Sequence, residues 1–227
     1  MAKNNNLLEN ITPPHPKQGG ANFKLPQHYV EYVKRRSTLS FLKGLLGRFY
    51  LNTKNEIRLY YARRKGAVIG KGTWITWHVA KMANENLIIG CDCSIEAKSI
   101  DLRGKVIIGD HVIINSGVEI IRVSHHIDSD RTFSYKYYPD LRIDSYSWIS
   151  TGTKILPGVS KIARGSVCGA YSVMVKDTEE MGVYGGNPAK MLRFHDTVYD
   201  DFLVSSFHGT DLSCYLKARG IENQNYK

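Results

Sequence analysis

The feature that most constrains this chain is a six-residue period of large apolar side chains. The period is clearest in the second half, where one extra residue at Lys161 interrupts it. Its starts are Ile143, Ile149, Ile155, Ile162, Cys168 and Met174, and a small or β-branched residue follows four places later at Ser147, Thr153, Val159, Ser166 and Ser172. An α-helix repeats about every 3.6 residues and a strand about every 2, so this period predicts a β-solenoid in which each hexad makes one short strand and one corner.

The same period runs through the preceding part of the chain. The upstream pairs are Ile69 with Thr73, Ile75 with Val79, Ile89 with Cys93, Ile95 with Ser99, Leu102 with Val106, Ile108 with Val112, Ile114 with Val118, and Ile120 with Ser124. If three hexads close one triangular coil, successive coils stack at the strand spacing of about 4.8 Å and both members of each pair face the core. The alternative, a β-sandwich, predicts alternating runs at spacings of about 8 to 12 residues instead.

The period breaks once, directly after Ile120. His125 stands at this break, and residues 126–142 form an excursion before the count resumes. His125 follows an inward-facing position, so strand alternation points its side chain out of the coil. A hydroxyl is a poor nucleophile at neutral pH, and histidine supplies a base with a pKa near that pH. We therefore expect a functional site here, with a solvated loop histidine as the alternative.

Three polar residues accompany His125 in the excursion. Asp128 is a candidate to accept a hydrogen bond from the second ring nitrogen of His125 and fix its tautomer, or else an ordinary loop carboxylate. His126 and Asp130 are candidates for contacting a substrate. Neighbouring residues on a strand face opposite ways, so His125 and His126 are not both expected to act as bases.

Residues 68–193 resemble the left-handed β-helix acyltransferases built from hexapeptide repeats. The resemblance is carried by the hexads together with Ser124-His125, Trp148-Ile149, the run from Leu156 to Val159 and the run from Gly186 to Lys190. These motifs are similar to the branch that O-acetylates sugars of O-antigen, colanic-acid-type and other exopolysaccharides. The resemblance implies an all-β, left-handed parallel β-helix and an acetyl-CoA-dependent O-acetyltransferase of surface polysaccharide (O-antigen, capsule or exopolysaccharide) biosynthesis. It also implies a homotrimer whose active sites lie between two solenoids, with no resident metal.

The resemblance also assigns roles residue by residue. His125 would take the proton of the acceptor hydroxyl, which attacks acetyl-CoA directly without an acyl-enzyme. The backbone N–H of Thr151 would donate to the developing oxyanion. The implied cofactor contacts are Trp148 to pantetheine or sugar, Gly169 and Ala170 along the pantetheine channel, and Lys176, Lys190 and Arg193 on the phosphates. For Trp148 plain packing on the outside of the coil is an equal alternative, and the extra residue at Lys161 predicts a bulge or a wider corner.

The positive charge is concentrated before the solenoid. The chain has 227 residues and a net charge of +10, and residues 24–65 alone hold 11 basic and 2 acidic residues. Residues 27–64 are predicted to be mainly helical. We favour a helical cap over the open solenoid end, ahead of a helix on an anionic membrane surface, and no nucleic-acid motif accompanies the charge. The expected divisions are a disordered tail at 1–22, a basic helical cap at 23–65, the β-helix at 66–193 and a C-terminal helical extension at 194–227.

Location and alternative functions complete the sequence-based expectations. The start of the chain has no apolar signal-like core, no stretch of 18 apolar residues exists, and the four cysteines form no Cys-x-x-Cys pair. These observations favour a cytoplasmic protein, with peripheral contact at the inner face of the membrane through residues 24–65. Three alternatives stay open: N-acetylation of a nucleotide-linked amino sugar, a non-catalytic scaffold, and a γ-type carbonic anhydrase with zinc on His78, His111 and either His125 or His126.

Overall fold

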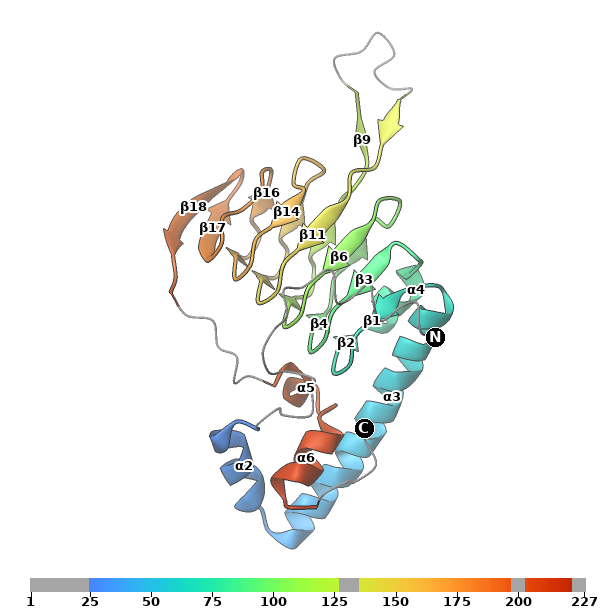
Figure 1. The fold of residues 1–227 in the computed structure, drawn as a ribbon, viewed down its shortest axis with the longest axis vertical. Coiled ribbons are helices and arrows are strands. Elements are labelled where there is room, and N and C mark those ends of the chain that lie inside the picture. Colours follow the sequence, from blue (N-terminus) through green and yellow to red (C-terminus); the bar gives the residue numbers. More distant parts are fainter. Residues whose placement is uncertain (1–24, 127–134, 197–202, 222–227) are drawn as a thin grey trace.

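The structure is a computed structural model that describes residues 25–126, 135–196 and 203–221. It contains a parallel β-solenoid of about six turns, with helices at the N-terminal and C-terminal regions. Figure 1 shows the coils stacked along one axis, with the long helix α3 (Thr38–Arg64) at the end where the stack begins. The fold predicted from the hexads is therefore confirmed. The predicted disordered tail lies outside the described residues.

Three sheets run along the sides of the triangular stack. Sheet 1 contains β1 (Val68–Ile69), β3 (Leu87–Ile89), β6 (Val106–Ile108), β11 (Leu141–Ile143) and β14 (Lys161–Ile162). Sheet 2 contains β2 (Trp74–Ile75), β4 (Ser94–Ile95), β7 (Ile113–Ile114), β12 (Trp148–Ile149), β15 (Val167–Cys168), β17 (Gly182–Gly186) and the antiparallel β18 (Ala189–Phe194). Sheet 3 contains β5 (Ser99–Ile100), β8 (Glu119–Ile120), β13 (Lys154–Ile155) and β16 (Val173–Met174).

The core follows the predicted period. In sheet 2 the hexad starts stack in register from coil to coil, as Ile75, Ile95, Ile114, Ile149 and Cys168, and each is fully buried. The small inward residues satisfy their hydroxyls on corner carbonyls. Ser147 Oγ donates to Asp144 O at 2.7 Å, and Thr153 Oγ1 donates to Gly169 O at 3.0 Å. This explains why polar residues occupy the fifth place of a hexad in an otherwise apolar interior.

Two of the upstream hexads were assigned wrongly. Ile100, five residues after Ile95, takes the strand position opposite Ile120, because the corner before it is one residue shorter than the period requires. Leu102 is buried in the following turn, and is not a hexad start. Ser99 is accordingly only half-buried, and Ser124 is half-buried for a different reason, because it already belongs to the excursion after Ile120.

The first coil has a helix where the hexads predict a strand. Helix α4 (Trp77–Met82) forms its third side, and the Thr76 side chain caps it by accepting from the Val79 N–H at 3.2 Å. Val79 is buried as predicted, but it packs from a helix over the open end of the core. The strand pattern stops at Thr76, which caps the start of this helix, and the six-residue period alone does not reveal the helix.

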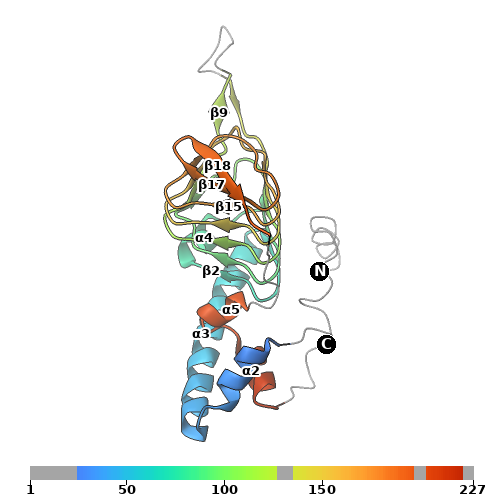
Figure 2. The same ribbon diagram turned by 90° about the vertical axis from the view of Figure 1, so that its left-hand side faces the viewer.

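The helical cap is built from both ends of the chain, as Figure 2 shows. It contains α2 (Gln27–Lys34), α3 (Thr38–Arg64), α5 (Val204–Phe207) and α6 (Leu212–Ala218). The buried Asp211 carboxylate accepts from the Tyr29 hydroxyl and from Arg48 Nε, the latter at 2.8 Å. Burial and the neighbouring Asp211 raise the pKa of Tyr29 well above its usual value. The predicted helical cap and helical extension are therefore one unit. Among the described residues, no helix is long and apolar enough to cross a membrane.

Candidate active site

The excursion after Ile120 begins as an antiparallel hairpin that projects from the stack (Figure 1). Its strands are β9 (Ser124–His125) and β10 (Lys136–Tyr137), in which His125 pairs with Lys136. His125 is half-buried at the root of this hairpin. The His126 side chain is exposed, and its ring lies 4.8 Å from the Tyr137 ring. Asp128 and Asp130 lie outside the described residues.

Arg122 fixes the root of the hairpin to the next coil. Its side chain is fully buried although it is large and charged. The guanidinium donates to five backbone carbonyls: Pro139 O at 3.0 Å, Asp140 O at 3.5 Å, Leu156 O at 3.3 Å, Pro157 O at 3.1 Å and Val159 O at 2.8 Å. The planar fork of arginine suits such divergent acceptors. Sequence analysis missed Arg122; its signal was a cation two residues after a hexad start, immediately before the break.

The returning strand of the hairpin is held to the preceding coil. A Cβ added at Gly104 would lie 2.7 Å from Pro139 O, so the close passage of the backbone requires glycine. The Lys105 N–H donates to Asp140 Oδ1 at 2.8 Å, and the Arg103 guanidinium lies 5.1 Å from the Tyr138 ring centre. His125 therefore stands on a root that is anchored from both neighbouring coils.

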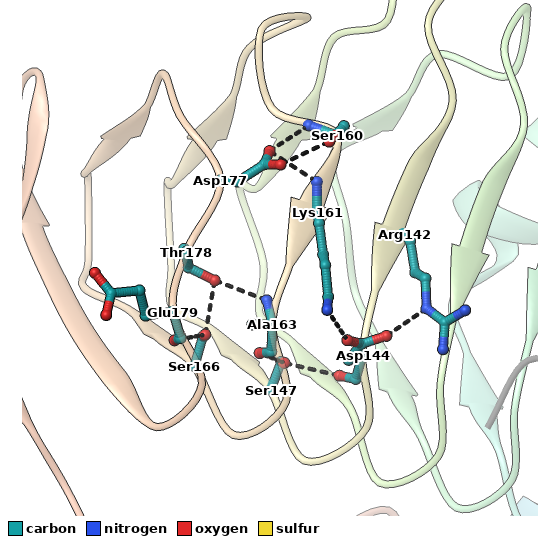
Figure 3. Close-up of polar contacts among 10 residues, drawn as sticks. All are labelled: Arg142, Asp144, Ser147, Ser160, Lys161, Ala163, Ser166, Asp177, Thr178 and Glu179. Carbon is teal, nitrogen blue, oxygen red and sulfur yellow. Dashed lines mark hydrogen bonds and ion pairs between the residues drawn. The ribbon is translucent and has the colours of Figure 1, made fainter. Parts of the chain in front are cut away.

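The corner below the hairpin absorbs the extra residue at Lys161. Lys161 itself pairs in register with Arg142 in sheet 1, so the strand has no bulge and the corner is wider instead. Asp177 from the following coil closes this corner, accepting from Ser160 N, Ser160 Oγ and Lys161 N at 2.6, 2.7 and 2.9 Å (Figure 3). Burial alone would raise the pKa of Asp177, but these hydrogen bonds outweigh it and the pKa is lowered.

A second corner carries the other half of the predicted site. We call the corner between sheets 2 and 3, at residues 115–117, 150–152 and 169–171, the Thr151 corner. The Tyr171 N–H donates to Thr151 O at 2.9 Å, and the exposed Tyr171 ring covers Gly152, where an added Cβ would lie 2.5 Å from it. Within the described part of the chain the Thr151 N–H makes no hydrogen bond. An amide that has not been used in the fold is available to an oxyanion.

The predicted cofactor residues gather around the Thr151 corner and sheet 2, with one exception. Gly169 and the exposed Ala170 belong to that corner. Trp148 lies on the outer face of sheet 2, 47% exposed, and its Nε1 donates to Asn115 Oδ1 at 2.6 Å. Lys190 and Arg193 are exposed on β18 at the end of the same sheet, whereas Lys176 follows β16 at a different corner.

The structure does not bring His125 and Thr151 together within one chain. We call the corner between sheets 3 and 1, at residues 121–123, 156–160 and 175–178, the His125 corner. His125 follows β8, whose partner in the next coil is β13, whereas Thr151 precedes β13. One full side of the triangle therefore separates them. Lys176 shares the corner of His125 and is separated in the same way from Gly169 and Ala170.

The histidines proposed for a zinc site are not assembled. In the described residues, no group of three or more His, Cys, Asp or Glu side chains could hold a metal ion. His78 lies in α4, with Nε2 2.5 Å from Lys98 O, and His111 stacks on Tyr146 at a corner between sheets 1 and 2, with ring centres 4.9 Å apart. These two residues are held in separate contacts, away from the hairpin that carries His125.

Comparisons with known proteins point to one class. No family model matches the chain. The chain is 30% identical over 135 residues to a galactoside O-acetyltransferase of Lactococcus lactis, covering 59% of this chain and 56% of that protein. It is 30% identical over 108 residues to a chloramphenicol acetyltransferase of Klebsiella aerogenes, covering 39% of this chain and 51% of that protein. The chain thus spans about half the length of the curated relatives it matches.

A solved structure extends the likeness to about three quarters of the chain. The hexapeptide-repeat acetyltransferase structure from Vibrio cholerae superposes with a TM-score of 0.50 at 20% identity, over 73% of this chain and 92% of that one. The solenoid thus has the hexapeptide-repeat fold. In sequence the chain is therefore similar to acetyltransferases, and its fold is that of a hexapeptide-repeat acetyltransferase, as the sequence motifs predicted.

Proposed function

We propose that this chain is an acetyl-CoA-dependent O-acetyltransferase that modifies a sugar hydroxyl in surface polysaccharide biosynthesis, with the reaction in the cytoplasm. The observation that carries the proposal is the single half-buried histidine at the anchored root of the hairpin. The galactoside O-acetyltransferase among the relatives supports a saccharide acceptor. The fold by itself would support many functions, so the argument depends on this site.

In the proposed reaction, His125 accepts the proton of the sugar hydroxyl while the oxygen attacks the thioester carbonyl carbon. The Thr151 N–H donates to the oxyanion of the tetrahedral intermediate. The carbon–sulfur bond then breaks, and the protonated His125 returns its proton to the leaving thiolate. Asp128 remains the candidate to fix the tautomer of His125, and His126 and Asp130 remain candidates for contacting the acceptor.

The separation of the two corners supports a homotrimer. Because His125 and Thr151 lie one side of the triangle apart in each chain, a complete site requires the His125 corner of one copy to face the Thr151 corner of the next. A closed ring of three copies repeats this heterologous contact and completes every site. In this arrangement Trp148, Gly169 and Ala170 would line the pantetheine channel, and Lys176, Lys190 and Arg193 would bind the cofactor phosphates.

The primary test measures acetyl-CoA binding by calorimetry and free-thiol release, with wild type beside three variants. We expect His125→Ala to keep binding but to lose about 100-fold or more of thiol release, because the general base is gone. Lys190→Ala/Arg193→Ala should weaken binding, and the exposed-lysine control Lys154→Ala should do neither. A folded wild type that binds no acetyl-CoA would sink the proposal.

The shared site has its own test, because two inactive chains should complement each other. His125→Ala lacks the base, and Thr151→Pro lacks the N–H, whereas Thr151→Ala keeps the N–H and should stay active. Random mixing in equal amounts pairs an intact His125 with an intact neighbouring Thr151 at about one site in four, so about a quarter of wild-type activity should return. No recovery in mixtures that light scattering shows to be trimeric would contradict a site between copies.

A further inference from the structure

Helix α3 presents a second apolar face to solvent. Its inner face is used within the chain: Phe41 packs on Tyr215 at 4.8 Å, and Leu59 and Ala62 join the solenoid core. Its outer face also carries large apolar side chains, each between 43% and 71% exposed: Leu39, Leu42, Leu46, Phe49, Tyr50, Ile57, Tyr60 and Tyr61. A helix with large apolar side chains on two opposite faces is normally covered on both. The described residues leave most of this face exposed along the outside of α3 (Figures 1 and 2), and at its end the Tyr61 ring lies 6.1 Å from the Trp77 ring.

The outer residues form a stripe that the exposed Thr53 interrupts between Tyr50 and Ile57. They follow one another at spacings of mostly three and four, which places them on one side of a helix, opposite the buried Phe41, Asn55 and Leu59. The helix has 27 residues and, at 1.5 Å per residue, is about 40 Å long. A stripe that runs along most of this length exceeds the scattered apolar residues of an ordinary surface and marks an interaction face.

Lysines border one edge of the stripe. Lys43, Lys54 and Lys65 are spaced eleven residues apart and so lie on nearly the same side of the helix. Lys54 Nζ lies 4.4 Å from the Tyr50 ring centre and Lys65 Nζ lies 5.6 Å from the Tyr61 ring centre. The ammonium groups of Lys54 and Lys65 therefore lie beside aromatic rings of the stripe, and that of Lys65 also donates to Lys81 O.

The charge of this segment selects the partner. Residues 25–65 hold ten basic and two acidic residues, so a second copy of the same face would be repelled. Nucleic acid calls for donors and stacking rings at the centre of its binding surface, and the centre of this stripe is aliphatic. A broad apolar centre edged by lysines and tyrosines matches a helix that lies in the plane of a lipid interface.

We propose that the outer face of α3 binds the surface of an anionic lipid bilayer, with the helix in the plane of the membrane and Lys43, Lys54 and Lys65 at the headgroups. The inference is independent of the acetyltransferase activity. It concerns a face that contains none of the residues placed in the active site.

The test is co-sedimentation of the full chain with vesicles of phosphatidylcholine, with and without phosphatidylglycerol. We expect binding only to the anionic vesicles, falling as salt is raised. Lys43→Gln/Lys54→Gln/Lys65→Gln should lower the partition coefficient by about tenfold or more. Leu46→Gln/Phe49→Gln/Ile57→Gln should abolish binding. The matched control Lys71→Gln/Lys105→Gln/Lys154→Gln removes the same charge from the solenoid and should bind like wild type.

Four outcomes would overturn the proposal. If the control variant loses as much vesicle binding as the Lys43/Lys54/Lys65 variant, net charge alone causes the binding. If wild type does not bind anionic vesicles, the face has no lipid partner. If the apolar triple variant instead dissociates the oligomer, as seen by light scattering, the stripe is an interface between copies. If a DNA duplex binds and the apolar triple variant retains that binding, the partner is a soluble polyanion. Unchanged thiol release in the variants would show that they are folded.

Discussion

Different interactions stabilise the walls of the solenoid, which are its three sheets and their regular corners, and its His125 corner. In the walls each residue repeats the role of the residue six places before it, and burial of stacked aliphatic side chains supplies the stability. At the His125 corner nothing repeats: Arg122 holds five carbonyls, Gly104 admits the returning strand, and Asp177 closes a corner that is one residue too long. The comparison teaches that the repeat builds the scaffold and that single, non-repeating residues position the site.

The largest effect should come from breaking the wall. Ile113 and Ile114 are neighbours in β7 with the same side chain on opposite faces, half-buried outside and fully buried inside. Ile114→Ala should cost about 4 kcal/mol of unfolding free energy, because it leaves a cavity between Ile95 and Ile149. Ile113→Ala should cost about 1 kcal/mol or less. Urea unfolding of the pair measures this, and equal losses would mean that the outer face is also buried, as contact between copies in the proposed trimer would do.

Arg122 tests the corner. Arg122→Met removes the donors to five carbonyls in a buried setting, so we expect a loss of about 3 kcal/mol. If the guanidinium positions the hairpin, thiol release should fall more than acetyl-CoA binding does, and Arg122→Lys should restore only part of it because an ammonium cannot reach the same acceptors. Arg63→Met is the matched control, since Arg63 donates to the Ile69 carbonyl in the first coil, away from the hairpin. Turnover that tracks stability alone in both variants would reduce Arg122 to a structural role.

How far the sequence could predict this protein follows from the same comparison. The walls were predictable because every coil repeats the same six-residue pattern. The assignment of hexads failed where one corner is shortened before Ile100 and where α4 replaces a strand. The place of His125 at the start of an excursion was predictable because the period breaks there, whereas its role as a base stays a prediction. The hydrogen bonds of Arg122 were not, because its acceptors are backbone carbonyls that carry no sequence signature.

The separation of the two corners was also beyond the sequence. The side of the triangle on which Thr151 falls depends on where the count resumes after the excursion, and an excursion of unknown path does not fix that phase. The stripe on α3 is a further case. An apolar pattern on both sides of a helix predicts burial, yet only the packed structure shows which side has found its partner.

Two carboxylates, one in a wall and one at the His125 corner, should make stability depend on pH in opposite directions. Asp92, in the wall, should have the larger effect. It lies at a wall corner where burial, and then the neighbouring Asp110, raise its pKa to about 6. A raised carboxyl pKa means that the ionised form destabilises the fold, fully above about pH 6 and not at all below about pH 4. Asp92→Asn should therefore stabilise the protein by about 2 kcal/mol at pH 8. Asparagine also tolerates the positive φ of 52° at this position. A stabilisation that persists at pH 4 would contradict an electrostatic origin.

Asp177, at the His125 corner, should behave in the opposite sense. Its pKa is lowered, because three hydrogen bonds to the ionised form outweigh burial, so its contribution is present above about pH 4 and is lost as the pH falls through the lowered pKa. Because the residue is exposed to solvent, Asp177→Asn should cost only about 1 kcal/mol at pH 7. At neutral pH the urea midpoint of wild type should exceed that of Asp177→Asn, and the two should converge in acid. For Asp92→Asn the variant should have the higher midpoint, and this difference should also vanish in acid. If wild type and Asp177→Asn differ in stability by the same amount at pH 3 and pH 7, the loss comes from the geometry of the asparagine side chain. The long corner would then be closed by packing and not by charge.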